Sequence, residues 1–152
     1  EAVQMMSKII RQVEGGPDYQ AQLDVSRPKA EATTSDAISC AIRRISNILP
    51  VAVLVNYSES GTSSLRAARE RPAVPILNLT PNLTTARRLS VAWGVHSVVN
   101  DRLRQVDEVC STALEIAQAQ GMAQRGDTLL ITAGVPFGQP GSTNSLRIET
   151  LI

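Results

Sequence analysis

Apolar residues at the start of the chain recur at the spacing of one helical face: Met5, Met6, Ile9, Ile10 and Val13. The Gly-Gly-Pro sequence at residues 15–17 ends this pattern, which therefore predicts a helix over residues 1–15. Residues 17–32 are polar without a clear period, and we expect irregular backbone there with at most a short turn of helix. Because the helical pattern is already present at Glu1, which is not a Met, we expect the sequence to be cut from a longer protein.

A second apolar stripe at helical spacing runs through residues 33–49 and consists of Ile38, Ala41, Ile42, Ile45 and Leu49. Asp36 stands in the first turn of this predicted helix, where a negative charge is favourable, and Pro50 ends the helix. Residues 51–55 then read Val-Ala-Val-Leu-Val, a short apolar run bounded by breakers. This run predicts a strand that is buried on both faces.

The alternation of helical and strand patterns continues to the end of the chain. Helices are predicted over residues 62–71, 82–93 and 105–120, and strands over 75–79, 95–99, 128–132 and 145–152. Strands separated by helices predict an α/β fold, a three-layer αβα sandwich with a mostly parallel sheet of five strands. The last strand follows a loop too short for a helical crossover, so we expect an antiparallel strand at an edge. The whole chain, residues 1–152, is predicted to form a single domain.

Composition excludes several classes of function. The 15 basic and 14 acidic residues give a net charge of +1, without the basic excess that binding to duplex nucleic acid needs. Aromatic residues make up 3% of the chain, too few for a platform that stacks single-stranded bases. No apolar run approaches the roughly 18 residues of a membrane span, and no signal peptide is visible. We therefore expect no nucleic-acid partner and no membrane association.

Cysteine and histidine are scarce in this sequence. Cys40 and Cys110 are far apart and His96 is the single histidine, which excludes the usual zinc sites. Two isolated thiols fit a reducing compartment, so we expect a cytoplasmic protein. The motifs GxSxG, GxxxxGK[ST] and GxGxxG are absent. A small hydrolase that pairs His96 with a serine of residues 58–64 remains an alternative, but the visible chemistry favours recognition over catalysis.

Two predicted loops follow strands at the edge of the sheet where ligands bind in parallel α/β folds. Residues 56–64 lead into a helix N-terminus and contain five Ser or Thr side chains and a glycine. Free backbone N–H groups of residues 61–64 and the helix dipole predict an anion site there, although an ordinary Ser/Thr helix cap explains the same composition. Residues 133–144 contain three glycines, which indicates either a close approach to a ligand or a tight connection into the edge strand.

A series of motifs in this order resembles the C-terminal domain of pyruvate kinase over essentially all 152 residues. The matching segments are residues 1–6, 36–39, 58–61, 71–72 with 75–76, 80–82, 85–87, 93–95, 126–127, 131–136 and 141–144. The resemblance implies a glycolytic parent enzyme, a kinase that transfers phosphate from phosphoenolpyruvate to ADP to give pyruvate and ATP. It also implies Mg²⁺ and K⁺ in that parent. Segments resembling the family's catalytic residues are not present, so we expect this segment by itself to be inactive and to bind no cofactor.

The resemblance implies a regulatory and oligomerisation domain. Its expected partners are the catalytic barrel of the same chain, adjoining the helix at residues 1–15, and further copies in a homodimer or tetramer. Contacts between copies are expected through residues 33–49 and 145–152. The alternative is a stand-alone αβα module that binds small phosphorylated metabolites.

The resemblance also assigns an allosteric site for a phosphorylated effector. The effector phosphate is expected in the first loop, at Ser58, Ser60, Gly61, Thr62 and Ser63, and a second loop is expected to close over it at Gln139, Gly141 and Ser142. Family members activated by fructose 1,6-bisphosphate often have a basic residue at the position of Glu59 or Thr62. Neither is basic here, which disfavours that bisphosphate and leaves a sugar monophosphate or a nucleotide such as AMP. Arg66, one helical turn away, is expected to compensate for Glu59.

Overall fold

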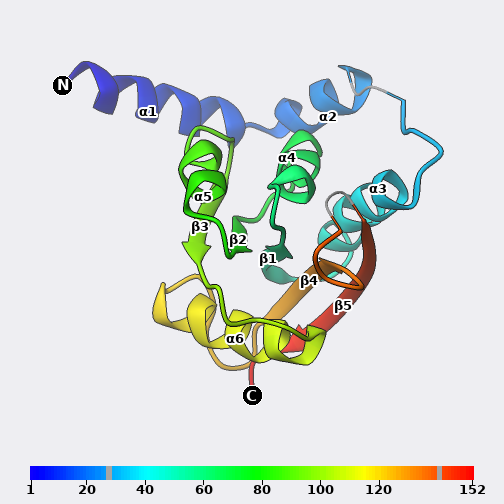
Figure 1. The fold of residues 1–152 in the computed structure, drawn as a ribbon. Helices are drawn as coiled ribbons and strands as arrows, with labels where there is room; N and C mark the ends of the chain where they lie inside the picture. The colour runs from blue at the N-terminus through cyan, green and yellow to red at the C-terminus, as the bar shows by residue number, and fades with distance from the viewer. Residues whose placement is uncertain (27–28, 140–141) are drawn as a thin grey trace. The chain divides into compact units, whose positions relative to one another are not determined.

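The computed structural model describes residues 1–26, 29–139 and 142–152, and the chain divides into two compact units, Glu1–Ala30 and Glu31–Ile152. The first unit contains helices α1 (Ala2–Glu14) and α2 (Pro17–Ser26). Helix α1 matches the predicted helix, and its apolar side chains are exposed. Figure 1 shows the order of all elements along the chain.

The prediction of irregular backbone after residue 17 was wrong, because α2 is helical over 10 residues. Its start has two ordinary helix signals, Pro17 at the first helical position and Asp18 in the first turn. Its apolar residues share no face, and Val25 is 90% exposed. The periodicity that revealed the other helices was therefore absent.

Five strands form one sheet in the order β3-β2-β1-β4-β5. They are β1 (Val51–Tyr57), β2 (Ile76–Thr80), β3 (Val95–Val99), β4 (Thr128–Gly134) and β5 (Thr143–Thr150). The first four strands are parallel, and β5 is antiparallel to β4 at an edge. This arrangement confirms the predicted fold class. The last strand begins two residues earlier than expected, at Thr143, because it pairs with the end of β4 at Gly134.

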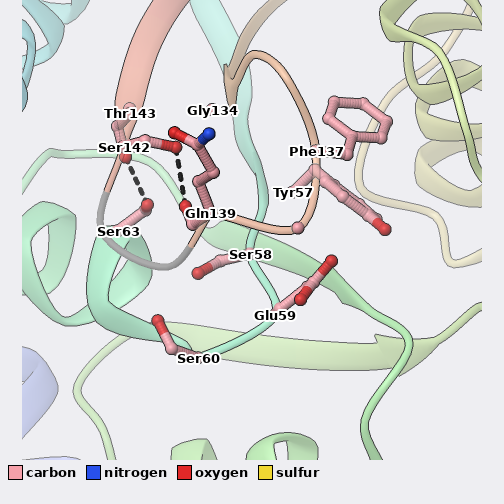
Figure 2. A pocket seen from close by; sticks show the side chains of 11 residues that line it. Tyr57, Ser58, Glu59, Ser60, Ser63, Gly134, Phe137, Gln139, Ser142 and Thr143 are labelled. Carbon is pink, nitrogen blue, oxygen red and sulfur yellow. Dashed lines mark hydrogen bonds between the residues drawn. The ribbon is translucent and has the colours of Figure 1, made fainter.

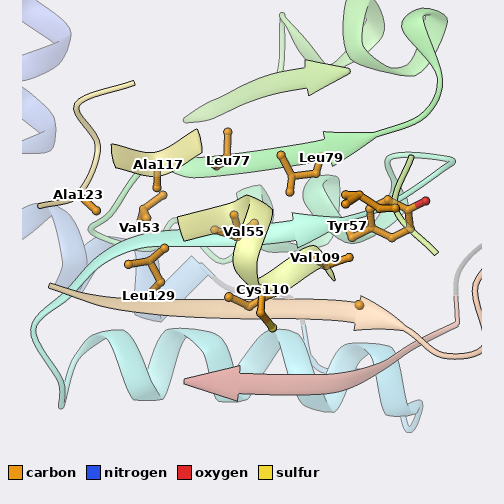
Figure 3. Packing of buried hydrophobic residues seen from close by; sticks show 14 of the residues in the cluster. Val53, Val55, Tyr57, Leu77, Leu79, Val109, Cys110, Ala117, Ala123 and Leu129 are labelled. Carbon is orange, nitrogen blue, oxygen red and sulfur yellow. The ribbon is translucent and has the colours of Figure 1, made fainter. Parts of the chain in front are cut away.

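Helices cover both faces of the sheet. Helices α3 (Thr34–Ser46) and α4 (Thr62–Arg69) pack on one face, with α5 (Leu83–Leu89) beside α4 against β2 and β3. Helix α6 (Val106–Ala119) covers the other face over an aliphatic core that includes Val53, Val55 and Leu129 (Figure 3). Burial of such side chains stabilises each by roughly 1.5–3 kcal/mol.

Helices α3, α4 and α5 end two to four residues before the predicted ends at 49, 71 and 93. Leu49 precedes Pro50, and the residue before a proline is disfavoured in helical backbone. Arg71 adopts left-handed backbone, with a φ of 50°, and so cannot continue α4.

Candidate functional site

The two loops selected from the sequence meet in one pocket beyond the carboxyl ends of β1 and β4 (Figure 2). Between these strands the connections change from one face of the sheet to the other, since α4 follows β1 and α6 precedes β4 on the opposite face. Ligands of open α/β sheets bind at such a point. We call this the hydroxyl pocket; its lining is Tyr57, Ser58, Glu59, Ser60, Ser63, Gly134, Phe137, Gly138, Gln139, Ser142 and Thr143. Its cavity volume is about 30 Å³, far below the roughly 300–1,000 Å³ of small-molecule sites, so a ligand would also have to occupy the open mouth of the pocket.

Five of the predicted site residues line the hydroxyl pocket, namely Ser58, Ser60, Ser63, Gln139 and Ser142. Gly61 and Thr62 are not part of the lining; they form the start of α4. Gly141 lies outside the described residues. Thr143, Phe137 and Gly134 line the pocket without having been predicted as site residues.

The hydroxyls of Ser58 and Ser60 accept N–H groups at the start of α4 and also line the pocket, so the two interpretations of this loop are compatible. Ser58 Oγ accepts the Gly61 N–H at 3.0 Å, which removes that N–H from the expected phosphate donors. A hydroxyl that accepts one hydrogen bond retains its own proton for donation. The Ser60 and Thr62 hydroxyls share one bond at 2.9 Å, and the Ser63 and Thr143 hydroxyls share another, so each pair also retains one proton. The loop therefore offers several uncharged donors.

Helix α5 supports this loop through two contacts that the sequence did not indicate. Thr85 Oγ1 donates to the Glu59 carbonyl at 2.8 Å, and the Arg88 guanidinium donates to the Ser60 carbonyl. The residues of each pair are separated by more than 25 positions, and no local motif connects them. These contacts fix the two loop carbonyls against α5.

A row of polar side chains across neighbouring strands of the sheet positions α4. Thr132, Asn56, Asn78 and Ser97 are neighbours in register across β4, β1, β2 and β3. Ser64 of α4 lies above the row: its hydroxyl accepts from Asn56 Nδ2 at 3.2 Å and donates to Asn78 Oδ1 at 2.8 Å. Since buried polar groups need partners, this row fixes the first turn of α4 over the strand ends.

The electrostatics of the pocket differ from the expectation that Arg66 offsets Glu59. Arg66 Nε instead lies 3.9 Å from the carboxylate of Asp36, which is in α3. Among the described residues that line the hydroxyl pocket, none is basic and Glu59 is acidic. Burial, followed by the charge of Glu59, raises the pKa of Tyr57, so this phenol stays neutral at physiological pH.

A second hollow adjoins the hydroxyl pocket and shares four residues with it. We call it the adjoining hollow; its lining is Tyr57, Glu59, Pro81, Asp101, Leu103, Arg104, Phe137 and Gly138. The rings of Tyr57 and Phe137 lie 4.6 Å apart between the two spaces. Arg104 Nη1 donates to the carbonyls of Asp101 and Leu103 at 2.6 and 2.9 Å, so its guanidinium already binds its own loop.

Other candidate chemistry lies away from the pocket. His96 is exposed on β3 and is not among the pocket residues, so nothing pairs it with the serines of the hydrolase alternative. Burial raises the pKa of the Cys110 thiol in α6. Within the described parts of the chain, no group of three or more His, Cys, Asp or Glu side chains is placed to bind a metal ion. The helices of the same residues include none with the length and hydropathy to cross a membrane.

Comparison with known proteins gives one consistent result. A family model described as "Pyruvate kinase, alpha/beta domain" matches residues 36–149. The chain is similar to a pyruvate kinase from Methylorubrum extorquens, with 41% identity over 148 residues, or 97% of this chain and 31% of that protein. It is also similar to pyruvate kinases from Clostridium acetobutylicum (30% identity; 99% of this chain, 32% of that protein) and Geobacillus stearothermophilus (32%; 99% and 26%). The chain therefore spans about a third or less of the length of these curated relatives.

Proposed function

The chain belongs to the family of pyruvate kinase α/β domains, and from that premise we propose that it is the regulatory and assembly domain of a larger cytoplasmic enzyme. The larger enzyme would transfer phosphate from phosphoenolpyruvate to ADP. This chain would bind a phosphorylated metabolite in the hydroxyl pocket. The observation that supports this role is the convergence of hydroxyl donors on the first turn of α4 at the sheet's crossover point.

Mg²⁺ and K⁺, which the family resemblance implies, are assigned by this proposal to the larger enzyme. The described residues include no group of three or more His, Cys, Asp or Glu side chains that could hold a metal ion. We propose that the contribution of this chain is recognition. Phosphoenolpyruvate-dependent ATP formation is the assay for the larger enzyme; a stand-alone binding module would retain the binding of the metabolite without that activity.

The proposed binding mode uses neutral donors. Phosphate oxygens would accept hydrogen bonds from Ser58 and from the Ser60–Thr62 and Ser63–Thr143 pairs, close to the N-terminus of α4. The positive end of the helix dipole favours the anion there. Gln139 and Ser142 line the pocket near Thr143, and Ser142 Oγ donates to the Gln139 carbonyl at 2.6 Å. In this proposal both residues close over the ligand.

The adjoining hollow favours a ligand with one phosphate. Glu59 and Asp101 both line it, and carboxylates accept hydrogen bonds from hydroxyl groups such as those of a sugar. A second phosphate would meet the two negative charges of Glu59 and Asp101 against the single positive charge of Arg104, whose Nη1 already donates to two carbonyls of its own loop. We therefore propose a sugar monophosphate or nucleoside monophosphate, and not a sugar bisphosphate, as the ligand.

Replacing Glu59 by lysine tests the binding site. The charge reversal should tighten binding of a phosphate ester about tenfold at low ionic strength, because a charge-assisted hydrogen bond replaces a repulsion. The gain should decrease at high salt. Calorimetric titration with fructose 1,6-bisphosphate, glucose 6-phosphate and AMP measures the change, which should be largest for the bisphosphate.

The matched control is Glu115→Lys, which makes the same charge change at an exposed position of α6 that is outside both spaces. It should leave all three affinities nearly unchanged. Equal affinities for Glu59→Lys and the unaltered protein would mean that residues 58–64 form only a helix cap.

The proposed contact between copies uses the edge strand β5 and helix α3, which pack against each other. An unpaired edge is a template for pairing with another chain, and Ile148 on this strand is 47% exposed. In a two-fold arrangement the same surface would serve both copies. The exposed apolar face of α1 would be covered by the catalytic barrel of the same chain.

Replacing Ile148 by lysine is expected to weaken self-association about tenfold or more, because it places a charge in a desolvated contact. Sedimentation velocity over a range of protein concentrations measures this effect. Val91→Lys is the control, since Val91 is 91% exposed on the loop between α5 and β3. Identical sedimentation of the two variants and the unaltered protein would rule out β5 as the interface.

A further inference from the structure

Thr143 connects three elements that are distant in the sequence. It begins β5 and is 5% exposed. Its hydroxyl shares a hydrogen bond with the Ser63 hydroxyl of α4, as Figure 2 shows. Its carbonyl accepts the Ser35 hydroxyl, from the first turn of α3, at 3.3 Å. One buried residue thus bonds to the first turns of both α3 and α4.

The bond between Ser63 and Thr143 has two arrangements, because either hydroxyl can donate to the other. In each arrangement the acceptor hydroxyl retains a free proton. Both side chains line the hydroxyl pocket, so an anion there would accept a hydrogen bond from that hydroxyl and favour one arrangement over the other. Occupation of the pocket therefore acts directly on a bond that positions Thr143.

We propose that Ser35 is a positioning residue: through the Thr143 carbonyl it couples occupation of the hydroxyl pocket to the first turn of α3. This inference rests on the proposed binding function and adds the regulation of that site. Helix α3 and strand β5 are also the elements that we propose contact another copy, so the coupling would reach that surface. Coupling between sites is reciprocal, so loosening α3 must also affect the first turn of α4.

A double-mutant cycle tests the connection without any ligand. Ser35→Ala and Ser63→Ala each remove a different bond to Thr143, and the two side chains come from different helices. We expect the double variant to change amide hydrogen exchange rates in residues 35–39 and 62–66 by a factor that differs about threefold from the product of the two single-variant factors. Ser46→Ala is the control, because its hydroxyl donates within α3 to the Ile42 carbonyl. An additive Ser35–Ser63 pair would overturn the connection.

Inorganic phosphate tests the regulation. In the unaltered protein, saturating phosphate should slow exchange in residues 35–39 about threefold. Ser35→Ala lies outside the pocket lining and should still bind phosphate but lose this response, and Ser35→Thr, which restores a hydroxyl, should recover it. Ser39→Ala removes a different buried bond of α3, to the Ser35 carbonyl at 2.9 Å, and should retain the response.

The results of these experiments distinguish failure of the regulatory coupling from failure of the proposed binding function. Phosphate binding without slower exchange in α3, or the same response in Ser35→Ala, would overturn the coupling while leaving the binding function intact. No phosphate binding to the unaltered protein would overturn the binding function and the regulatory role together. The double-mutant cycle would then still decide whether Ser35, Thr143 and Ser63 act as one unit.

Discussion

Replacing Asp36 by asparagine is expected to lower the free energy of unfolding by about 3 kcal/mol at neutral pH. The Asp36 carboxylate is fully buried at the contact of α3 with α4. It accepts the Glu31 N–H at 2.7 Å and the Arg69 guanidinium at 2.6 Å. A neutral amide cannot balance the charge of Arg69. The cost is at the low end for a broken buried pair because the Arg69 side chain is 35% exposed and can be hydrated.

The same substitution should change the dependence of stability on pH. The Glu31 N–H and the Arg69 guanidinium lower the pKa of Asp36 from its ordinary value. In the unfolded chain the pKa of an aspartate is about 3.9, so the ionised carboxylate contributes its full stabilisation above that pH. This contribution is lost as the pH falls through the lower native pKa. The stability difference between the two proteins should therefore be largest at neutral pH and shrink below about pH 4.

Urea unfolding at a series of pH values measures both effects. Asp107→Asn is the matched control, because Asp107 pairs with Arg147 at 2.5 Å but is 86% exposed. Exposed pairs contribute little to stability, so this variant should lose only a small fraction of what Asp36→Asn loses. A stability difference for Asp36→Asn that does not depend on pH would show that folding does not lower the pKa of Asp36.

Replacing Gly61 by alanine is expected to lower the free energy of unfolding by about 2–5 kcal/mol and to weaken ligand binding. Gly61 precedes α4 with φ of +80°, a left-handed backbone that costs other residues about 1–2 kcal/mol. An added Cβ would also lie 3.0 Å from Thr85 Cγ2 and 3.1 Å from Leu89 Cδ1. Overpacking of this kind costs about 1–3 kcal/mol more. Relief of the contact would move the first turn of α4, which forms one side of the hydroxyl pocket.

Gly121→Ala separates the two contributions. Gly121 also has a left-handed φ, +67°, but an added Cβ there would have no neighbour within 4 Å. It should show the backbone cost alone and leave ligand binding unchanged. Urea unfolding and calorimetric titration of both variants give the comparison. Equal destabilisation by the two substitutions would mean that the α5 side chains move away from a side chain at position 61 at little energetic cost.

The sequence alone determined the sheet and the helices that flank it. Apolar runs such as residues 51–55 identified strands because burial on both faces requires it. The start of the helix predicted over residues 82–93 was also readable, since Asn82 caps α5 and its Oδ1 accepts the Thr84 and Thr85 N–H groups at 2.9 and 3.4 Å. Both signals depend on residues within a few positions of one another. The family resemblance then placed the two loops in one site before their contact was visible.

Only the tertiary structure decided which side chains support that site. Asn56 follows an apolar run and was assigned to the loop, whereas it lies within β1 and bonds to Ser64. Arg66 was expected near Glu59 but pairs with Asp36, because one face of α4 packs against α3. Arg88 and Thr143 reach the first loop from segments 28 and 80 residues away. Such contacts depend on how whole helices and strands pack against one another. The spacing of residues along the chain indicates each helix or strand but not which of them meet.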